Sequence, residues 1–204
     1  MNNYCDKFKL INKCKKSFLL VMLLYVFVYV TGCVGHYKNI PDVDRSPLNN
    51  NISKNVKVGI KKLPIVVSSG KKAIEDAFNE SKLFDNLEVY FEDDIPKEGI
   101  FIHVETKYKA PDLPAIVFGY VSVSTATILP AWSNNDGFDI YYRIYINGNL
   151  EKTFRYEKRR FAASWIFLLP FVWVNLFTTG EYDAFYTSTY DFLKSAQPIL
   201  LKYL

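Results

Sequence analysis

The chain has 204 residues, of which 50% are hydrophobic, and its 25 Lys and Arg against 21 Asp and Glu give a formal net charge of +4. A chain of this length can form one domain of ordinary size with its own core. Residues 1–32 hold five of the lysines and one aspartate, so the rest has 20 residues of each sign. That balance argues against a nucleic acid or another polyanion as the partner, because such binding needs clustered positive charge.

The segment before Cys33 divides into three zones. Residues 1–16 are polar and basic, residues 18–30 are wholly apolar, and two small residues, Thr31 and Gly32, come directly before Cys33. This order is the layout of a secretory signal peptide. As a helix the apolar run would cover about 20 Å, less than the roughly 30 Å core of a bilayer. A cleavable signal is therefore favoured over a permanent span.

The tetrapeptide Val30, Thr31, Gly32 and Cys33 resembles the lipobox of bacterial lipoproteins. The resemblance ends at Cys33, and Val30 and Thr31 stand where that family more often has leucine and alanine or serine. It implies that the Cys33 sulfur receives a diacylglycerol and that a signal peptidase cuts between Gly32 and Cys33. It also implies that the new amino group is acylated. An ordinary signal, or an uncleaved anchor with an incidental cysteine, is the alternative.

Cleavage before Cys33 changes what the rest of the chain can do. Cys5 and Cys14 would leave with the signal, so the mature chain would have one cysteine and no internal disulfide. Its partner at that cysteine would be membrane lipid. The resemblance further implies the periplasmic face of the outer membrane in a cell with two membranes, because Gly35, the second residue after the cysteine, is not aspartate.

Behind the cysteine the sequence predicts a tether and one domain. Residues 33–55 contain Asn, Asp, Pro and Ser without a sustained period, which is typical of a tether, and residues 56–204 follow as the domain. His103 is expected on the wetter face of its strand. The first expected elements are a strand over 56–67 and a helix from a cap at Ser68 or Ser69 to Ser81, with Ile74, Ala77 and Phe78 spaced for one buried face. A turn at 85–86 and strands over 87–92 and 100–108 follow.

The clearest local pattern is a hairpin. Apolar and polar side chains alternate from Phe138 to Ile146, then Asn147 and Gly148 follow, and residues 150–157 return as a partner strand. Asn-Gly is a preferred pair for a type I′ turn, in which both residues take positive φ. The pattern therefore predicts two antiparallel strands joined by a two-residue turn.

The last element is a helix over residues 181–196. Its aromatic residues have helical spacing, Thr178 or Thr179 is the expected cap, and Pro198 is expected near its end. Together the elements predict an α+β fold, with a mixed or antiparallel sheet, an early helix and a late helix.

Two uncharged segments, residues 115–132 and 161–177, flank the hairpin. Periodicity alone does not distinguish a buried apolar run from one in a membrane. The segments could be core of the same domain, one or two further membrane spans, or an apolar hairpin that dips into the leaflet of the lipid anchor. In the last case Trp132, Trp165 and Trp173 would lie near the lipid headgroups.

A basic run precedes the second segment and consists of Arg155, Lys158, Arg159 and Arg160. Two interpretations are open. The run could be a solvated strand end. It could instead be a collar that meets anionic headgroups, at about 1 kcal/mol per residue.

The sequence shows no constellation typical of catalysis. Its two histidines, His36 and His103, are far apart, and it has neither a glycine-rich phosphate loop nor a nucleophile elbow. We therefore expect no enzymatic activity, no cofactor and no metal. The predicted function is that of a lipid-anchored envelope lipoprotein, a binding or assembly component with an envelope protein as partner. An integral membrane protein of a transport or envelope complex, and an enzyme with an unfamiliar site, are the alternatives.

Overall fold

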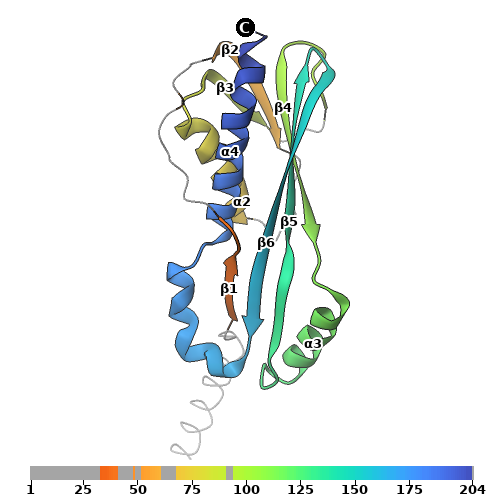
Figure 1. Cartoon of the computed structure of the whole chain (residues 1–204), viewed down its shortest axis with the longest axis vertical. Coiled ribbons are helices and arrows are strands. Elements are labelled where there is room, and N and C mark those ends of the chain that lie inside the picture. The colour runs from red at the N-terminus through yellow and green to blue at the C-terminus, as the bar shows by residue number, and fades with distance from the viewer. Residues whose placement is uncertain (1–32, 41–47, 49–51, 61–67, 91–93, 204) are drawn as a thin grey trace, which may run out of the picture.

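A curled six-stranded sheet organises the molecule (Figure 1). The computed structural model describes residues 33–40, 48, 52–60, 68–90 and 94–203. In chain order the elements are β1 (Cys33–Tyr37), β2 (Ile52–Ile60), α2 (Ser68–Glu80), β3 (Phe84–Tyr90), β4 (Ile100–Lys109), α3 (Leu113–Ser124), β5 (Ala131–Ile146), β6 (Asn149–Ser164), the 3-10 helix η1 (Ile166–Phe177) and α4 (Glu181–Leu201). The predicted α+β fold, with an early and a late helix, is confirmed.

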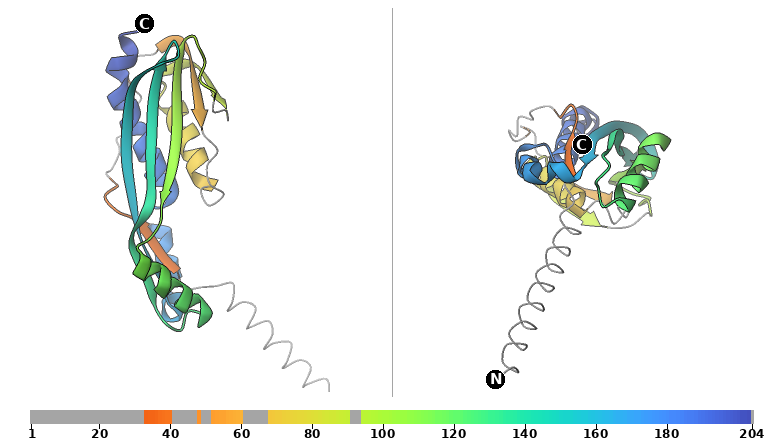
Figure 2. Two further views of the ribbon diagram at one scale, coloured as in Figure 1. Left: turned by 90° about the vertical axis from the view of Figure 1, so that its right-hand side faces the viewer. Right: turned by 90° about the horizontal axis from the view of Figure 1, so that it is seen from below.

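The sheet has the strand order β1-β6-β5-β4-β2-β3. Strand β2 runs parallel to both of its neighbours, whereas all the other pairs are antiparallel, so the sheet is mixed. Strands β5 and β6 have 16 residues each, which is more than the 10 of β4. Their far ends run on toward the pole opposite the C-terminus, where α3 and η1 lie (Figures 1 and 2).

Helices α2 and α4 cover one face of the sheet, and the core lies between them and the strands (Figure 2). The predicted inner face of the early helix is confirmed, because Ile74, Ala77 and Phe78 are buried. The two helices also share polar contacts, since the Tyr186 hydroxyl donates to Glu80 at 2.6 Å. The core is completed by one face of each central strand, with Ile100, Ile102 and Val104 from β4 and alternate residues of β5 from Phe138 to Ile144.

The predicted tether over residues 33–55 is wrong at both ends. Residues 33–37 form β1, which pairs with β6, and Tyr37 is a buried core residue. Residues 52–55 belong to β2. A strand as short as β1 is too short to show a period, so only the contact with β6 identifies it. The signal with Gly32, residues 41–47 and 49–51 of the tether, and the predicted strand residues 61–67 and 91–92 lie outside the described residues.

Three local boundaries also differ from their predicted positions. The first turn is at Lys82, which has a φ of 49°, and β3 already begins at Phe84. Helix α4 is capped at Gly180, whose N–H donates to the Asp183 carboxylate at 2.9 Å, so neither predicted threonine is the cap. The same helix continues past Pro198 to Leu201, because its last turn buries Leu200.

The predicted hairpin is confirmed with its turn. Asn147 and Gly148 have φ angles of 49° and 79°, as a type I′ turn requires, and Ile146 pairs with Asn149. The turn also contacts the loop before β4, because the Gly99 N–H donates to the Asn147 side chain at 2.9 Å and the Asn147 N–H donates to the Gly99 carbonyl. The register of the two longest strands is therefore fixed at this end.

Gly148→Val should destabilise the domain by about 1–2 kcal/mol, because a β-branched residue is strained at positive φ. A Cβ at this position would meet no atom closer than 3.6 Å, so backbone strain is the whole effect. Gly148→Asn is the matched control, since asparagine tolerates this conformation and should cost less. Thermal unfolding followed by circular dichroism measures both variants, and equal melting temperatures for valine and asparagine would contradict the prediction.

Candidate functional site

One pole of the molecule carries most of its exposed apolar side chains. Fifteen of the eighteen large apolar residues that are exposed in the described part of the chain belong to residues 113–132 or 165–177. These residues form α3, the loop after it, the start of β5, and η1, which lie together at the pole opposite the C-terminus (Figures 1 and 2). We call this surface the apolar end. Monomeric soluble proteins seldom expose apolar patches of large size, so the apolar end marks an interaction surface.

Helix α3 has no polar face to present to water. It begins at Leu113 with Pro114 in its first turn, and Ser122 is its only buried residue. Tyr120 and Val123 are about three-quarters exposed. A surface helix of a soluble domain normally places an apolar stripe on the core and charges outside. In α3 the small polar Ser122 faces inward and the apolar side chains face outward.

The 3-10 helix η1 contributes the other half of the apolar end. None of its residues is buried, and its exposed side chains include Phe171, Trp173, Leu176 and Phe177. Runs of 3-10 helix as long as this one are uncommon. Pro170, in its middle, lacks the N–H group that an α-helix would need there.

The two uncharged segments meet at the tips of β5 and β6. The Ile166 N–H donates to the Thr127 carbonyl at 2.9 Å, and the Trp165 indole N–H donates to the Ile128 carbonyl at 3.0 Å. The ring of Trp132 stacks on Phe118, with the ring centroids 6.2 Å apart. The segments therefore form one continuous surface although the whole hairpin separates them in the sequence.

The structure contradicts one of the three predicted placements. The segments are not core, because neither α3 nor η1 buries an apolar side chain and Ala131 alone is a buried apolar residue of the two segments. In the described part of the chain, no helix has the length and apolar character needed to cross a membrane.

Cys33, the predicted lipidation site, lies at this end as the first residue of β1. Strand β1 pairs on one side with β6, where Cys33 is opposite Ser164. On its other side the Asn175 side chain acts like a strand partner, because its amide donates to the Cys33 carbonyl at 2.7 Å and its oxygen accepts from the Gly35 N–H at 3.0 Å. Thr179 continues this contact at Tyr37. The backbone of Cys33 is therefore fixed.

The Cys33 thiol is exposed and is the one free cysteine of the described chain. Nearby protein removes water from around the sulfur and raises the pKa of Cys33, with a smaller opposing effect from Arg160. At neutral pH the group is a thiol and a poor spontaneous nucleophile. It borders a pocket of about 160 Å³ between α3 and the β5–β6 strands. The other lining residues are Ala115, Gly119, Ala131, Trp132, Ser133, Ala162, Ala163 and Ser164.

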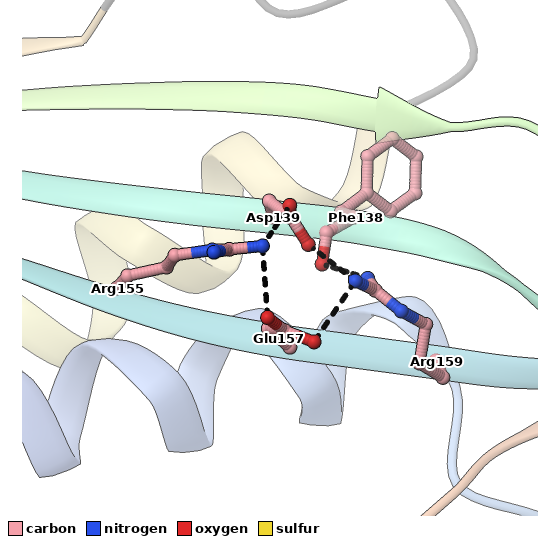
Figure 3. Close-up of polar contacts among 5 residues, drawn as sticks. All are labelled: Phe138, Asp139, Arg155, Glu157 and Arg159. Atoms are coloured by element: carbon pink, nitrogen blue, oxygen red, sulfur yellow. Dashed lines mark hydrogen bonds and ion pairs between the residues drawn. The ribbon is translucent and has the colours of Figure 1, made fainter.

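The predicted basic run is not a set of free charges, because its arginines are paired with acidic side chains, although Arg155 remains exposed. Arg155 and Arg159 both bind Asp139 of β5, at 2.9 and 2.7 Å, and both also bind Glu157 (Figure 3). Partial burial acts to raise the pKa of Asp139, but the hydrogen bonds from the two arginines outweigh it and the pKa is lowered. These charges are used in pairing β5 with β6.

The other two members of the run lie nearer the apolar end or the core. Arg160 binds Asp136, whose carboxylate is almost fully buried and also accepts from the Ser133 hydroxyl at 2.8 Å. Lys158 is buried, which lowers its pKa, although Asp191 of α4 partly offsets this. Sequence analysis missed Asp136 and Asp139 as partners because they come from the opposite strand.

The two histidines are not brought together. His36 lies on β1 with its ring 5.7 Å from that of Phe161, whereas His103 is in β4. His103 lies on the predicted face, away from the core residues Ile102 and Val104, but it is buried there next to Arg143, at 3.4 Å. Within the described ranges, no group of three metal-binding side chains converges.

The chain matches no known protein family and no curated protein. The residues that build the candidate site are therefore assigned from geometry. Sequence analysis missed the role of Asn175, although one polar residue in an otherwise apolar run, "FVWVNLF", was a usable signal. Its partners, the backbone atoms of β1, lie about 140 positions earlier and leave no trace in local sequence.

Proposed function

We propose that the chain is the precursor of a bacterial envelope lipoprotein that is anchored to the membrane through acylated Cys33. The observation that carries the proposal is the position of Cys33. An exposed cysteine preceded by a lipobox-like sequence opens the strand that leads from the apolar end into the core. An acyl group on this sulfur would leave the domain at its apolar pole. The anchor would hold the domain directly, because β1 follows Cys33 without a flexible spacer.

The folded domain then acts by binding and assembly at the membrane surface, with an envelope protein as its partner. In support, several charged side chains that the fold brings together are bound to each other, as Arg143 is to Glu105 at 2.7 Å and Arg159 to Asp139. Because such cross-strand pairs stabilise a sheet, we assign these charges to the structure of the domain and not to a reaction. The proposed location is the periplasmic face of the outer membrane, because Gly35, the second residue after the cysteine, is not aspartate.

Replacing Cys33 with serine should abolish acylation of the chain. The full chain would be produced in a bacterium that processes lipoproteins, in the presence of a palmitate analogue that can be coupled to a dye. Cys14→Ser is the matched control, because Cys14 also lies in the N-terminal segment but does not follow small residues as Cys33 does. We expect dye on the wild type and on Cys14→Ser, and none on Cys33→Ser.

Separation of the dye-labelled chains by size on a gel also reports signal cleavage. Loss of the segment that precedes Cys33 makes the mature chain smaller, and Cys33→Ser should accumulate as the larger precursor. Equal labelling of wild type and Cys33→Ser, or a wild type that is never labelled, contradicts the proposal.

A further inference from the structure

We infer that the apolar end is a membrane-binding surface that enters the lipid leaflet to which the N-terminal part of the chain attaches. The partner is a phospholipid surface, which α3 and η1 both contact. The inference rests on the proposed function only for which leaflet the domain meets. Insertion of the folded domain into that leaflet is a separate claim, because lipidation of Cys33 does not require it.

Charge defines the boundary of this surface. No charged residue occurs between Asp112 and Asp136, and none between Arg160 and Glu181. The first charges that border the apolar end are Asp112, directly before α3, and the ion pair of Asp136 and Arg160. Lys38 is bound to the Asn134 carbonyl beside that pair. Polar and charged groups prefer the headgroup region, and uncharged apolar groups the acyl region. The ion pair therefore marks the level of the headgroups.

Backbone chemistry permits entry into the leaflet. Helical segments satisfy most of their N–H and C=O groups internally, as an apolar medium demands. The carbonyls of Val121 and Ser122 at the end of α3 accept from the Thr125 N–H and also from the Thr125 hydroxyl, at 3.0 Å. At the end of η1, the Thr178 hydroxyl donates to the Asn175 carbonyl. Insertion of the apolar side chains therefore exposes few polar backbone groups to lipid.

The N-terminal segment that leads to Cys33 favours a membrane over a protein as the partner of the apolar end. The apolar run of residues 18–30 ends just before Cys33, and Cys33 begins β1 at the apolar end. If Cys33 is lipidated, the acyl chains enter the leaflet beside α3 and η1. If the signal is retained as an anchor, the apolar run enters at the same place. Of the three alternatives for the sequence before Cys33, these two bring lipid to this surface, whereas removal of an ordinary signal does not.

The two helices flank the point of attachment. Seen from below, α3 lies on one side of the ends of the long strands and η1 on the other (Figure 2). Strand β1, with Cys33, contacts β6 and η1. Two or more acyl chains, as implied for Cys33, hold a protein firmly to a membrane. A lipid anchor flanked by two apolar helices would in addition fix the orientation of the domain on the membrane.

All three tryptophans of the chain belong to the apolar end, which provides a direct test without added probes. The full anchored chain would be extracted from membranes and reconstituted in phosphatidylcholine–phosphatidylglycerol vesicles. Matched vesicles would carry bromine near the top of the acyl chains, where it quenches tryptophans at that depth. We expect loss of most of the emission in brominated vesicles and little loss with iodide in the water.

A pair of variants separates insertion from mere proximity. Val123→Asp combined with Leu176→Asp places one charge on α3 and one on η1, both at highly exposed positions. These charges should restore emission in brominated vesicles and increase quenching by iodide. Leu150→Asp is the control, because Leu150 is exposed at the start of β6, at the far end from α3 and η1, and should change neither measurement.

Two other quenching results would overturn the inference. Emission that iodide quenches and bromine does not would show that the apolar end faces water. Emission that neither quenches would show that protein, such as a second copy of the chain, covers the tryptophans. Acyl labelling of Cys33 decides the proposed function separately, so a chain that lacks the label but is quenched by bromine would retain this inference and reject lipidation.

Discussion

Gly137→Ala is expected to lower the free energy of unfolding by about 3 kcal/mol or more, because strained backbone costs about 1–3 kcal/mol and forced overpacking costs about the same. A Cβ built at Gly137 would lie 2.0 Å from the backbone carbonyl oxygen of Lys158, and φ at this position is 148°. The clashing atom is backbone of β6, so a side-chain rotation cannot relieve the contact.

The position of Gly137 explains the size of this effect. It follows the irregularity between Ser133 and Asp136, and it pairs with Lys109 of β4 and Arg159 of β6. The β5–β6 pair leads from here to the apolar end. Separating the two backbones would therefore weaken the sheet and also disturb the platform that holds Cys33.

Gly119→Ala is the matched control, because a Cβ at Gly119 would meet no atom within 4 Å. Alanine is the better helix former by about 1 kcal/mol, so this variant should be neutral or slightly more stable. Thermal unfolding of the detergent-extracted chains should show a melting temperature for Gly137→Ala that is lower by roughly 2–4 °C per kcal/mol. Similar values for the two variants would show that the close approach of β5 and β6 at Gly137 is wrong.

The second large effect is expected from Tyr142→Ala, at about 3–5 kcal/mol, the usual cost of removing a buried aromatic ring. Tyr142 is fully buried in β5. Its ring stacks on Phe192 of α4 with centroids 4.4 Å apart and meets Tyr156 edge-on. Its hydroxyl lies 2.8 Å from that of Thr189, and burial raises the pKa of Tyr142. The variant removes a stacked aromatic contact between the long hairpin and the last helix.

Tyr142→Phe separates the ring from the hydroxyl. Thr189 keeps its own bond to the Phe185 carbonyl at 2.8 Å, so the loss of one neutral hydrogen bond should cost about 0.5–1.5 kcal/mol. The same unfolding measurement would then rank the wild type above phenylalanine and phenylalanine well above alanine. An alanine variant as stable as the phenylalanine variant would contradict the packing of α4 on β5.

The sequence by itself determined the elements whose signals are local. The alternation around Asn147-Gly148 predicted the hairpin and its turn, since both residues tolerate positive φ. The spacing of Ile74, Ala77 and Phe78 predicted the buried face of α2. The order of charge, apolar run and small residues before Cys33 predicted a lipidation site, which stays a prediction.

Only the tertiary structure decided what depends on distant partners. Strand β1 exists because β6 and Asn175 supply its hydrogen bonds, and so short a strand cannot show a period of its own. The sequence left the exposure of the two uncharged segments open, because an apolar run does not by itself indicate whether its side chains are buried in a core or exposed on a surface. Their contact at Thr127 and Ile166 and their closeness to Cys33 result from the pairing of β5 with β6, which brings residues far apart in sequence to one pole.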